Sequence, residues 1–252
     1  MHQLANIPTK APKDLDKRVV KEQTEGLLNE LNDLQNLLYA EGKHAILIVL
    51  QGMDASGKDG VIRKVFSRMN PQGVRVQSFK VPTEEEAAHD FLWRIHHHTP
   101  AKGMIQIFNR SHYEDVLVTR VHGWCDNDTA QKRFDAINAF EVMLVLHNNT
   151  QILKFYLHTS AEEQQERLRE RVEDPTKRWK YNAKDEQEAA KRDHYVQMYE
   201  DVFEQCSALP WTIVPADQNW YKEYLVARQL VDTFKSLDMK FPEVEIERSS
   251  NS

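Results

Sequence analysis

Two glycines separated by four residues, Gly52 and Gly57, are followed directly by Lys58 in the segment GMDASGKD. The six apolar residues at 45–50 that precede this segment predict a buried strand. A glycine turn between a strand and a helix directs backbone N–H groups, and the positive end of the helix dipole, toward phosphate oxygens. The segment therefore predicts phosphoryl chemistry, with these phosphate-binding residues: Gly52, Ala55, Ser56, Gly57, Lys58 and Asp59.

Two carboxylates in this loop are unusual. Asp59 follows the lysine, where a Ser or Thr hydroxyl normally binds Mg²⁺, so metal binding must be arranged differently. Asp54 lies among N–H groups meant for anions, which weakens anion binding unless a metal ion or an incoming nucleophile needs the carboxylate. A plain glycine turn is the alternative interpretation. The apolar residues at 61, 62, 65 and 66 fit a helix with one buried face, and this favours the phosphate loop.

A second group of polar residues follows a predicted strand that ends in Asn109. Arg110 comes next, and a guanidinium at the edge of a sheet can bind phosphate oxygens bidentately. Glu114 and Asp115 follow shortly after and have two interpretations. They take part in catalysis or metal binding, or they belong to the first turn of a helix, where Glu114 completes a capping box that Ser111 opens.

Six basic side chains lie between residues 166 and 180 of an otherwise acidic chain: Arg167, Arg169, Arg171, Lys177, Arg178 and Lys180. Arg167 and Arg171 are one helical turn apart, and Asp174-Pro175 ends their helix. A helix, a loop and a helix after the fourth strand is where kinases of this architecture carry a closing lid. We therefore predict that the cluster binds a polyanion. A solvated face is the alternative interpretation for Arg169, which points off the stripe, and a weaker alternative for Arg178.

Short apolar segments predict five strands, at residues 45–51, 74–81, 104–109, 152–158 and 211–215. Helical patterns lie between them, at residues 83–98, 162–173, 184–206 and 219–237, with a long helix from Thr129 onward. Strands that alternate with helices predict a parallel sheet covered on both faces. In such a sheet the ligand lies beyond the carboxyl ends of the strands, where the phosphate loop and the loops after Val81 and Asn109 converge.

The chain of 252 residues fits one domain, 1–252, because no stretch rich in proline, glycine or serine divides it. Leu27, Leu31, Leu34 and Leu38 mark one face of a helix in an N-terminal segment of about 13–42. This face is expected to pack on the core or on a partner subunit. The lid is expected at about 160–195, and a frayed polar tail at 242–252.

The composition narrows the class of protein. Hydrophobic residues make up 40% and charged residues 29%, and neither a membrane span nor a secretory signal is evident. Cys125 and Cys206 are too few for a disulfide framework or a zinc site, so a cytoplasmic protein is expected. The net charge of −6 argues against binding long nucleic acid through bulk electrostatics.

Five motifs, in this order, resemble the polyphosphate kinase 2 family: GMDASGKDG from Gly52, SFKVPTEEE from Ser78, HDFLWRIHHHTP from His89, FNRSHYEDVLVTRVH from Phe108 and DPTKRWKYN from Asp174. The resemblance covers residues 15–238. It implies a P-loop kinase fold similar to thymidylate kinase: a three-layer α/β sandwich with a five-stranded parallel sheet and a helical lid. It also implies an enzyme that phosphorylates nucleotides with inorganic polyphosphate, needs Mg²⁺, with Mn²⁺ as an alternative, and forms a homo-oligomer, a dimer or a tetramer.

Carried over residue by residue, the resemblance implies catalytic roles for Asp54, Lys58, Arg110, Glu114 and Asp115, with Asp54 and Asp115 as metal ligands. It implies nucleotide binding by Asn109, Arg110 and Glu114, and polyphosphate binding by the loop and by Arg171, Lys177, Arg178 and Lys180. Asn109 together with Glu114 resembles the class that accepts both nucleoside mono- and diphosphates. Another class of the family has aspartate in place of Asn109 and tryptophan in place of His112.

The reaction expected from this resemblance is a reversible in-line transfer of the terminal polyphosphate group to AMP or ADP, with GMP and GDP as further acceptors. The attacking phosphate oxygen is already ionised, so no general base is required, and Glu114 is expected to organise the metal's waters or the acceptor. Two alternatives stay open. One is an ATP-dependent nucleotide kinase on the same fold, and the other is a nucleotide-binding module without turnover.

Overall fold

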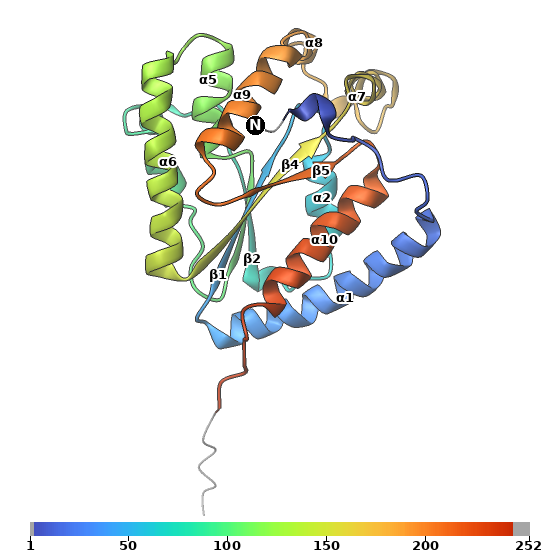
Figure 1. Ribbon diagram of the computed structural model, residues 1–252, viewed down its shortest axis with the longest axis vertical. Coiled ribbons are helices and arrows are strands. Elements are labelled where there is room, and N and C mark those ends of the chain that lie inside the picture. The colour runs from blue at the N-terminus through green and yellow to red at the C-terminus, as the bar shows by residue number, and fades with distance from the viewer. Residues whose placement is uncertain (1–2, 244–252) are drawn as a thin grey trace, which may run out of the picture.

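Five parallel strands form the sheet at the centre of the computed structural model, which describes residues 3–243 (Figure 1). They lie in the order β2-β3-β1-β4-β5. Their bounds are β1 (Ala45–Gln51), β2 (Val74–Ser78), β3 (Ile105–Asn109), β4 (Thr150–His158) and β5 (Trp211–Pro215). The predicted five-stranded parallel sheet is confirmed, although the strand expected at 74–81 ends already at Ser78.

The α-helices of the described residues are α1 (Lys17–Glu41), α2 (Lys58–Val65), α3 (Glu84–Ala87), α4 (Trp93–His96), α5 (Val118–Val121), α6 (Asn127–Asn148), α7 (Ala161–Glu173), α8 (Asp185–Ala189), α9 (Arg192–Gln205) and α10 (Asn219–Lys235). Short 3₁₀ segments are η1 (Leu4–Asn6), η2 (Pro71–Gly73), η3 (His112–Val116) and η4 (Arg178–Lys180). Between residues 3 and 243, no helix has the length and apolar character needed to cross a membrane. The tail expected at 242–252 lies almost entirely outside the described residues.

Strand β1 lies in the middle of the sheet and is buried along its whole length. Leu47 and Val49 face one hydrophobic cluster, and Ile46 and Ile48 face the other, because successive side chains of a strand point to opposite faces. A strand covered on both sides must be apolar throughout. The uninterrupted apolar run at 45–50 therefore places the phosphate loop at the end of the most deeply buried strand.

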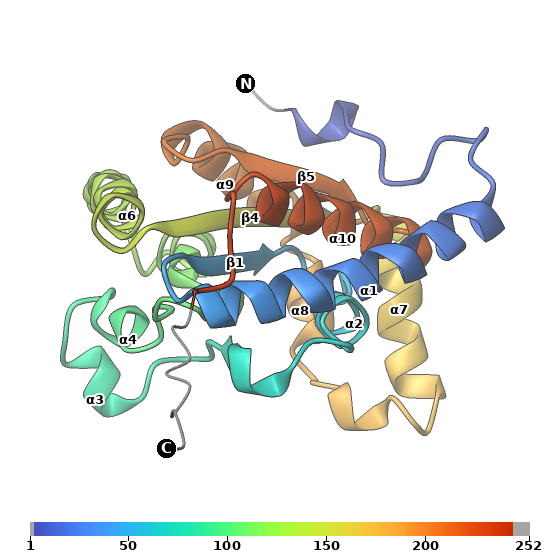
Figure 2. The same ribbon diagram turned by 90° about the horizontal axis from the view of Figure 1, so that it is seen from below.

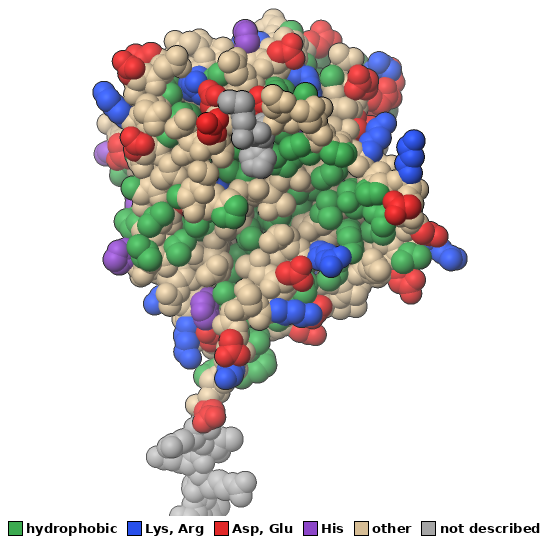
Figure 3. Space-filling view, in the orientation of Figure 1, with side chains coloured by type: hydrophobic (Ala, Val, Ile, Leu, Met, Phe, Trp, Pro, Cys, Tyr) green, Lys and Arg blue, Asp and Glu red, His purple; other side chains and the backbone are tan. Residues whose placement is uncertain are grey.

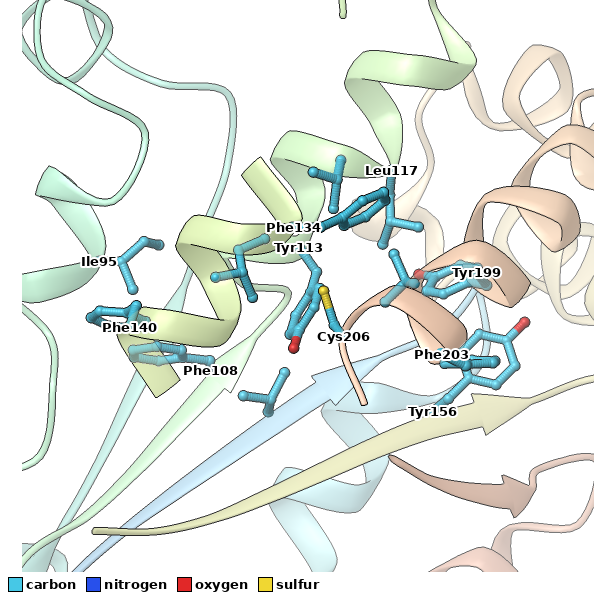
Figure 4. Close-up of a cluster of buried hydrophobic side chains, with 14 of the residues drawn as sticks. Ile95, Phe108, Tyr113, Leu117, Phe134, Phe140, Tyr156, Tyr199, Phe203 and Cys206 are labelled. Carbon is cyan, nitrogen blue, oxygen red and sulfur yellow. The ribbon is translucent and has the colours of Figure 1, made fainter. Parts of the chain in front are cut away.

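Helices cover both faces of the sheet (Figures 1 and 2). One face packs against α6, α9 and η3, and its core is rich in aromatic rings; Figure 4 shows Phe108, Tyr113, Phe140, Tyr156 and Phe203 in this layer. The other face packs against α1, α2 and α10, with α1 and α10 side by side. The predicted three-layer α/β sandwich is confirmed.

Helix α1 confirms the N-terminal helix expected within 13–42. Leu28, Leu31 and Leu38 are fully buried against α10 and the sheet, and Leu27 and Leu34 pack at the margin of the same cluster. The helix ends at Gly42, which has the left-handed conformation typical of a helix C-cap (φ 64°). The leucine repeat is thus buried within one chain, so it is no argument for a partner subunit.

Two helices predicted as continuous are interrupted. The segment expected at 83–98 forms α3, which Thr83 opens with a capping box, and then α4. The break occurs because Asp90 Oδ1 accepts the N–H of Leu92 (2.9 Å) and starts a new turn. The segment expected at 184–206 is divided into α8 and α9, where the N–H of Lys191 bonds to the carbonyl of Glu188 (3.1 Å) in a tighter turn.

A charged network lies in the core between β4, η3 and α6. Lys154 Nζ donates to Glu141 Oε2 (2.8 Å), to the Tyr113 hydroxyl (2.9 Å) and to the carbonyl of Cys206 (3.0 Å). Glu141 Oε1 accepts from the Tyr113 hydroxyl (2.7 Å) and lies 3.2 Å from His112 Nε2. All these side chains are fully buried, so each charge depends on its partners rather than on water. The network ties η3 to the core.

We predict that Lys154→Met lowers the free energy of unfolding by about 3–5 kcal/mol, because it leaves the carboxylate of Glu141 buried without a counter-ion. Urea denaturation followed by circular dichroism measures this loss.

Lys64→Met is the matched control. Lys64 forms an ion pair with Glu25 of similar length (2.6 Å), but both side chains are roughly 40% exposed, and an exposed pair contributes about 1 kcal/mol or less. Equal losses in the two variants would contradict a structural role for the buried network.

Candidate active site at the carboxyl edge of the sheet

The carboxyl ends of β1 and β3 meet at one edge of the sheet. Leu50 is paired with Asn109, and the N–H of Arg110 donates to the carbonyl of Leu50 (3.1 Å). The phosphate loop leaves β1 at this edge and leads into α2. An edge pocket opens here, and its lining residues are Gly52, Met53, Asp54, Arg110, Glu114, Gln164, Glu188, Arg192, Tyr195 and Tyr199.

The phosphate loop has a backbone that requires glycine at two places. Gly57, just before α2, has φ 94°, and Gly52 has φ 148°. A Cβ atom on Gly52 would lie 2.8 Å from Ser56 Oγ. Ala55 and Arg110 also have positive φ angles (61° each), which residues other than glycine rarely adopt. Such conformations are concentrated at functional sites, and here both residues lie at this edge of the sheet.

Arg110 connects two carboxylates in the edge pocket. Its guanidinium forms an ion pair with Asp54 and lies 3.9 Å from Glu114 Oε2. Burial acts to raise the pKa of Asp54, but Arg110 and Lys58 hold it below its ordinary value. Burial raises the pKa of Glu114 above its ordinary value, against the opposing effect of Arg110 and Lys58. Two carboxylates of different proton affinity therefore flank one guanidinium.

The capping-box interpretation of Glu114 is wrong. Ser111 Oγ accepts the N–H of Tyr113 (3.2 Å), while the N–H of Glu114 bonds to the backbone carbonyl of Ser111 (3.0 Å). The segment is the 3₁₀ helix η3, in which the third residue does not reach back to the first. The side chain of Glu114 is therefore directed into the edge pocket.

The structure does not bring Asp115 into this pocket. Its carboxylate lies 3.6 Å from Arg94 Nη2, and its carbonyl accepts hydrogen bonds from Thr119 (2.7 Å) and Arg133 (2.6 Å). Burial raises the pKa of Asp115 in spite of Arg94 and Arg133. The two residues predicted as metal ligands, Asp54 and Asp115, thus lie in separate polar clusters.

Asp59, in the position usually taken by Ser or Thr, links three parts of the site. Its Oδ1 accepts from Asn109 Nδ2 (2.9 Å), and its Oδ2 accepts from Lys180 Nζ (3.1 Å). The phosphate loop, the end of β3 and the segment predicted as the lid are therefore joined through one carboxylate. Asn109 lies beside the edge pocket rather than in its lining.

The segment predicted as the lid consists of α7, η4 and α8, and its basic side chains are paired. Arg171 binds Asp185 (2.8 Å), Lys177 binds Glu170 (2.6 Å), and Arg178 Nε donates to a backbone carbonyl of α7 (3.0 Å). Figure 3 shows side chains of both charge signs gathered over α7 and α8. A polyanion that binds here must displace several carboxylates.

Arg167 has partners other than the polyanion-binding surface predicted for it. Its guanidinium donates to backbone carbonyls of the phosphate loop and of the loop after β5, and only 14% of the side chain is exposed. Arg169, in contrast, is 60% exposed and pairs with Glu166 (2.8 Å), which favours the alternative interpretation of a solvated face.

Sequence analysis missed the wall of the edge pocket that Gln164 and α9 provide. The guanidinium of Arg192 binds the side chain of Gln164 and the carbonyl of Thr159. Tyr195 and Tyr199 line the pocket from the same helix. Arg192, Tyr195 and Tyr199 are spaced i, i+3 and i+7, so a search for polar and aromatic residues on one helical face could have found this wall.

The described residues contain no group of three or more His, Cys, Asp or Glu side chains placed to hold a metal ion. Mg²⁺ in phosphoryl-transfer sites is usually bound by one or two carboxylates together with substrate phosphates and water. Asp54 and Glu114, on either side of Arg110, fit such a partial set of ligands.

Comparison with known proteins extends these observations. Residues 14–242 match the family model described as Polyphosphate kinase 2 (PPK2). A Meiothermus ruber protein named AMP/ADP-polyphosphate phosphotransferase is 49% identical over 91% of this chain and 86% of its own length. A Rhodopseudomonas palustris protein named ADP-polyphosphate phosphotransferase is 42% identical over 86% of this chain and 79% of its own. The crystal structure of polyphosphate kinase 2 from Arthrobacter aurescens TC1 has a TM-score of 0.94 at 39% identity and covers 98% of this chain and 90% of that one.

These matches include the phosphate loop, the end of β3 and the segment predicted as the lid. The similarity therefore covers every element of the edge pocket, and the solved relative has the same fold over almost the whole chain. The P-loop kinase fold and the family predicted from the motifs are both confirmed, and the chain belongs to the polyphosphate kinase 2 family.

Proposed function

We propose that this protein is a polyphosphate-dependent nucleotide kinase. It transfers the terminal phosphoryl group of inorganic polyphosphate to AMP and ADP, reversibly, with GMP and GDP as further acceptors. The observation that carries the proposal is the pocket in which the phosphate loop, Arg110 and Glu114 meet at the carboxyl edge of the sheet. The names of the Meiothermus ruber and Rhodopseudomonas palustris relatives support both the donor and the acceptors.

Each residue has a role in this reaction. Lys58 and Arg110 stabilise the negative charge on the transferring group, and the N–H groups of the phosphate loop hold its oxygens. Arg171, Lys177, Arg178 and Lys180 bind the polyphosphate chain when their carboxylate partners are displaced. Asn109, Arg110 and Glu114 bind the acceptor nucleotide. Because the attacking phosphate oxygen is already ionised, Glu114 acts by organising the acceptor rather than by removing a proton.

Phosphotransferases generally need a divalent metal ion, and for this protein we propose Mg²⁺, with Mn²⁺ as an alternative. When bound, the ion neutralises phosphate oxygens of donor and acceptor. Asp54 is the proposed ligand in the edge pocket, and the contacts of Glu114 support it as the second. The metal role that the sequence suggests for Asp115 stays a prediction. A homo-oligomer is likewise proposed from the family alone, and a cytoplasmic location from the small number of cysteines.

The proposal is tested by offering purified protein, Mg²⁺ and polyphosphate either AMP or ADP, without ATP, and measuring products by HPLC. We expect ADP and then ATP from AMP, and ATP from ADP. Product from ADP alone would overturn the use of both acceptors. Transfer only after ATP is supplied as donor would favour the ATP-dependent kinase, and nucleotide binding without any product would favour a binding module.

The metal ligands are distinguished by the Mg²⁺ dependence of kcat. We predict that Asp54→Asn lowers kcat by about two orders of magnitude and raises the Mg²⁺ concentration needed for half of the maximal rate. Glu114→Gln and Asp115→Asn are compared in the same assay, and exposed Asp33→Asn on α1 is the control. A shifted Mg²⁺ dependence in Asp115→Asn, with none in Glu114→Gln, would restore the metal pair suggested by the sequence.

A further prediction concerns pH. Burial, together with Arg110, lowers the pKa of the Lys58 ammonium to about 8. The free enzyme therefore loses this positive charge as pH rises through 8, and kcat/KM for polyphosphate should fall by up to about tenfold per pH unit above that value. Lys58→Arg keeps its charge at these pH values. Its profile should stay flat over the same range, and an identical fall in this variant would assign the titration to another group.

A further inference from the structure

The carbonyl oxygens of residues 52–56 in the phosphate loop all accept hydrogen bonds from side chains. Lys58 Nζ donates to the carbonyls of Gly52 (2.8 Å) and Met53 (3.2 Å). Gln164 Nε2, from α7, donates to the carbonyl of Asp54 (3.1 Å). The N–H of Gly52 donates to the Tyr199 hydroxyl (3.2 Å) and that of Ser56 to the carbonyl of Met53 (3.1 Å). The other N–H groups of the loop can face a ligand because its carbonyls are held in this way.

Arg167 holds the central part of the loop. Its Nη1 donates to the carbonyls of Ala55 (3.1 Å) and Ser56 (2.9 Å). Its Nη2 donates to the carbonyls of Ala216 (2.8 Å) and Asp217 (3.0 Å), which follow β5. One guanidinium thus joins α7 to two loops through four backbone acceptors, a geometry that the planar fork of arginine suits and a lysine cannot reproduce.

Lys222 supports the same loop from α10. Its Nζ donates to the Ser56 carbonyl (3.3 Å) and to Asn219 Oδ1 (2.6 Å), and the side chain is fully buried. A Cβ atom on Gly57 would lie 2.1 Å from this nitrogen. Glycine is therefore needed at position 57 for two reasons: the positive φ angle of its backbone, and the space that Lys222 Nζ occupies.

We propose that Arg167 is a positioning residue of the phosphate loop, with Lys222 as its partner, and that it touches neither polyphosphate nor nucleotide. This inference rests on the proposed phosphate-binding function of the loop. The same contacts fix the first turns of α7, because Gln164 and Arg167 bind this helix to the phosphate loop. Any movement of the predicted lid therefore occurs in the residues that follow Arg167.

The test is calorimetric binding of tripolyphosphate and of long-chain polyphosphate, without nucleotide, to the wild type, Arg167→Met and Arg167→Lys. Arg169→Met, an exposed arginine of the same helix, is the matched control. We expect Arg167→Met to lower the affinity for both ligands by the same factor, about tenfold, because a misplaced loop affects the binding of the shortest chain as much as that of the longest. Arg167→Lys should show a smaller loss, and Arg169→Met less than a twofold change.

Other outcomes overturn the proposal. Weakened binding of long chains with unchanged binding of tripolyphosphate would show that Arg167 contacts the polyphosphate chain. A lower binding stoichiometry with unchanged affinity would show a role in folding alone. If Arg167→Met does not fold, Arg167→Lys and Lys222→Met decide. Both variants should lower the affinity for tripolyphosphate. Because Arg167 and Lys222 both donate to the Ser56 carbonyl, the fold-loss of affinity in the double variant should be smaller than the product of the two single fold-losses.

The binding assay separates this inference from the proposed function. A wild type that binds tripolyphosphate but forms no product from AMP or ADP would contradict the kinase activity and leave the positioning role to be judged from the variants. A wild type that binds neither phosphate ligand would overturn both.

Discussion

A peptide group carries its N–H and its carbonyl on opposite sides, so a loop that turns N–H groups toward an anion turns its carbonyls the other way. These carbonyls point into the protein, where each needs a donor. The phosphate loop of this protein depends on that requirement. Its donors come from α2, α7 and α10, which are far apart in the sequence, and the sheet must bring these helices together behind the loop before the binding face can exist.

The second half of the site depends on the core. Arg110 and Glu114 follow β3, whose register with β1 places them beside the loop. The 3₁₀ segment that carries Glu114 also carries His112 and Tyr113, and both contact the buried carboxylate of Glu141. A charged network in the aromatic layer therefore fixes the core-facing side of this segment, while Glu114 of the same segment faces the edge pocket. Stability and binding geometry are coupled through one short turn.

Patterns local in the sequence predicted much of this structure. The apolar run of β1, the glycine spacing and the leucine repeat of α1 each depend on neighbouring residues, and each was confirmed. The differences between prediction and structure concern side chains with competing partners at long range. Arg167 has the spacing of a lid residue, but its guanidinium donates hydrogen bonds to carbonyls of loops more than 40 residues away in the sequence. Glu114 fits a capping box by type, and only the 3₁₀ geometry shows that its side chain goes elsewhere. The wall formed by α9 could be predicted only with knowledge of how the sheet brings this helix to the phosphate loop.

The pairing of lid cations with carboxylates of the same chain has a consequence for ligand choice. Arg171, Lys177 and Lys180 each have a built-in counter-ion, namely Asp185, Glu170 and Asp59. An anion of low valence that displaces one carboxylate exchanges one ion pair for another and gains little. A long polyanion displaces several in succession, and after the first exchange the others are intramolecular. Under the proposed function, this pairing selects ligands by valence, since the basic side chains of this segment gain little from a small anion and become available only to a ligand that engages several of them.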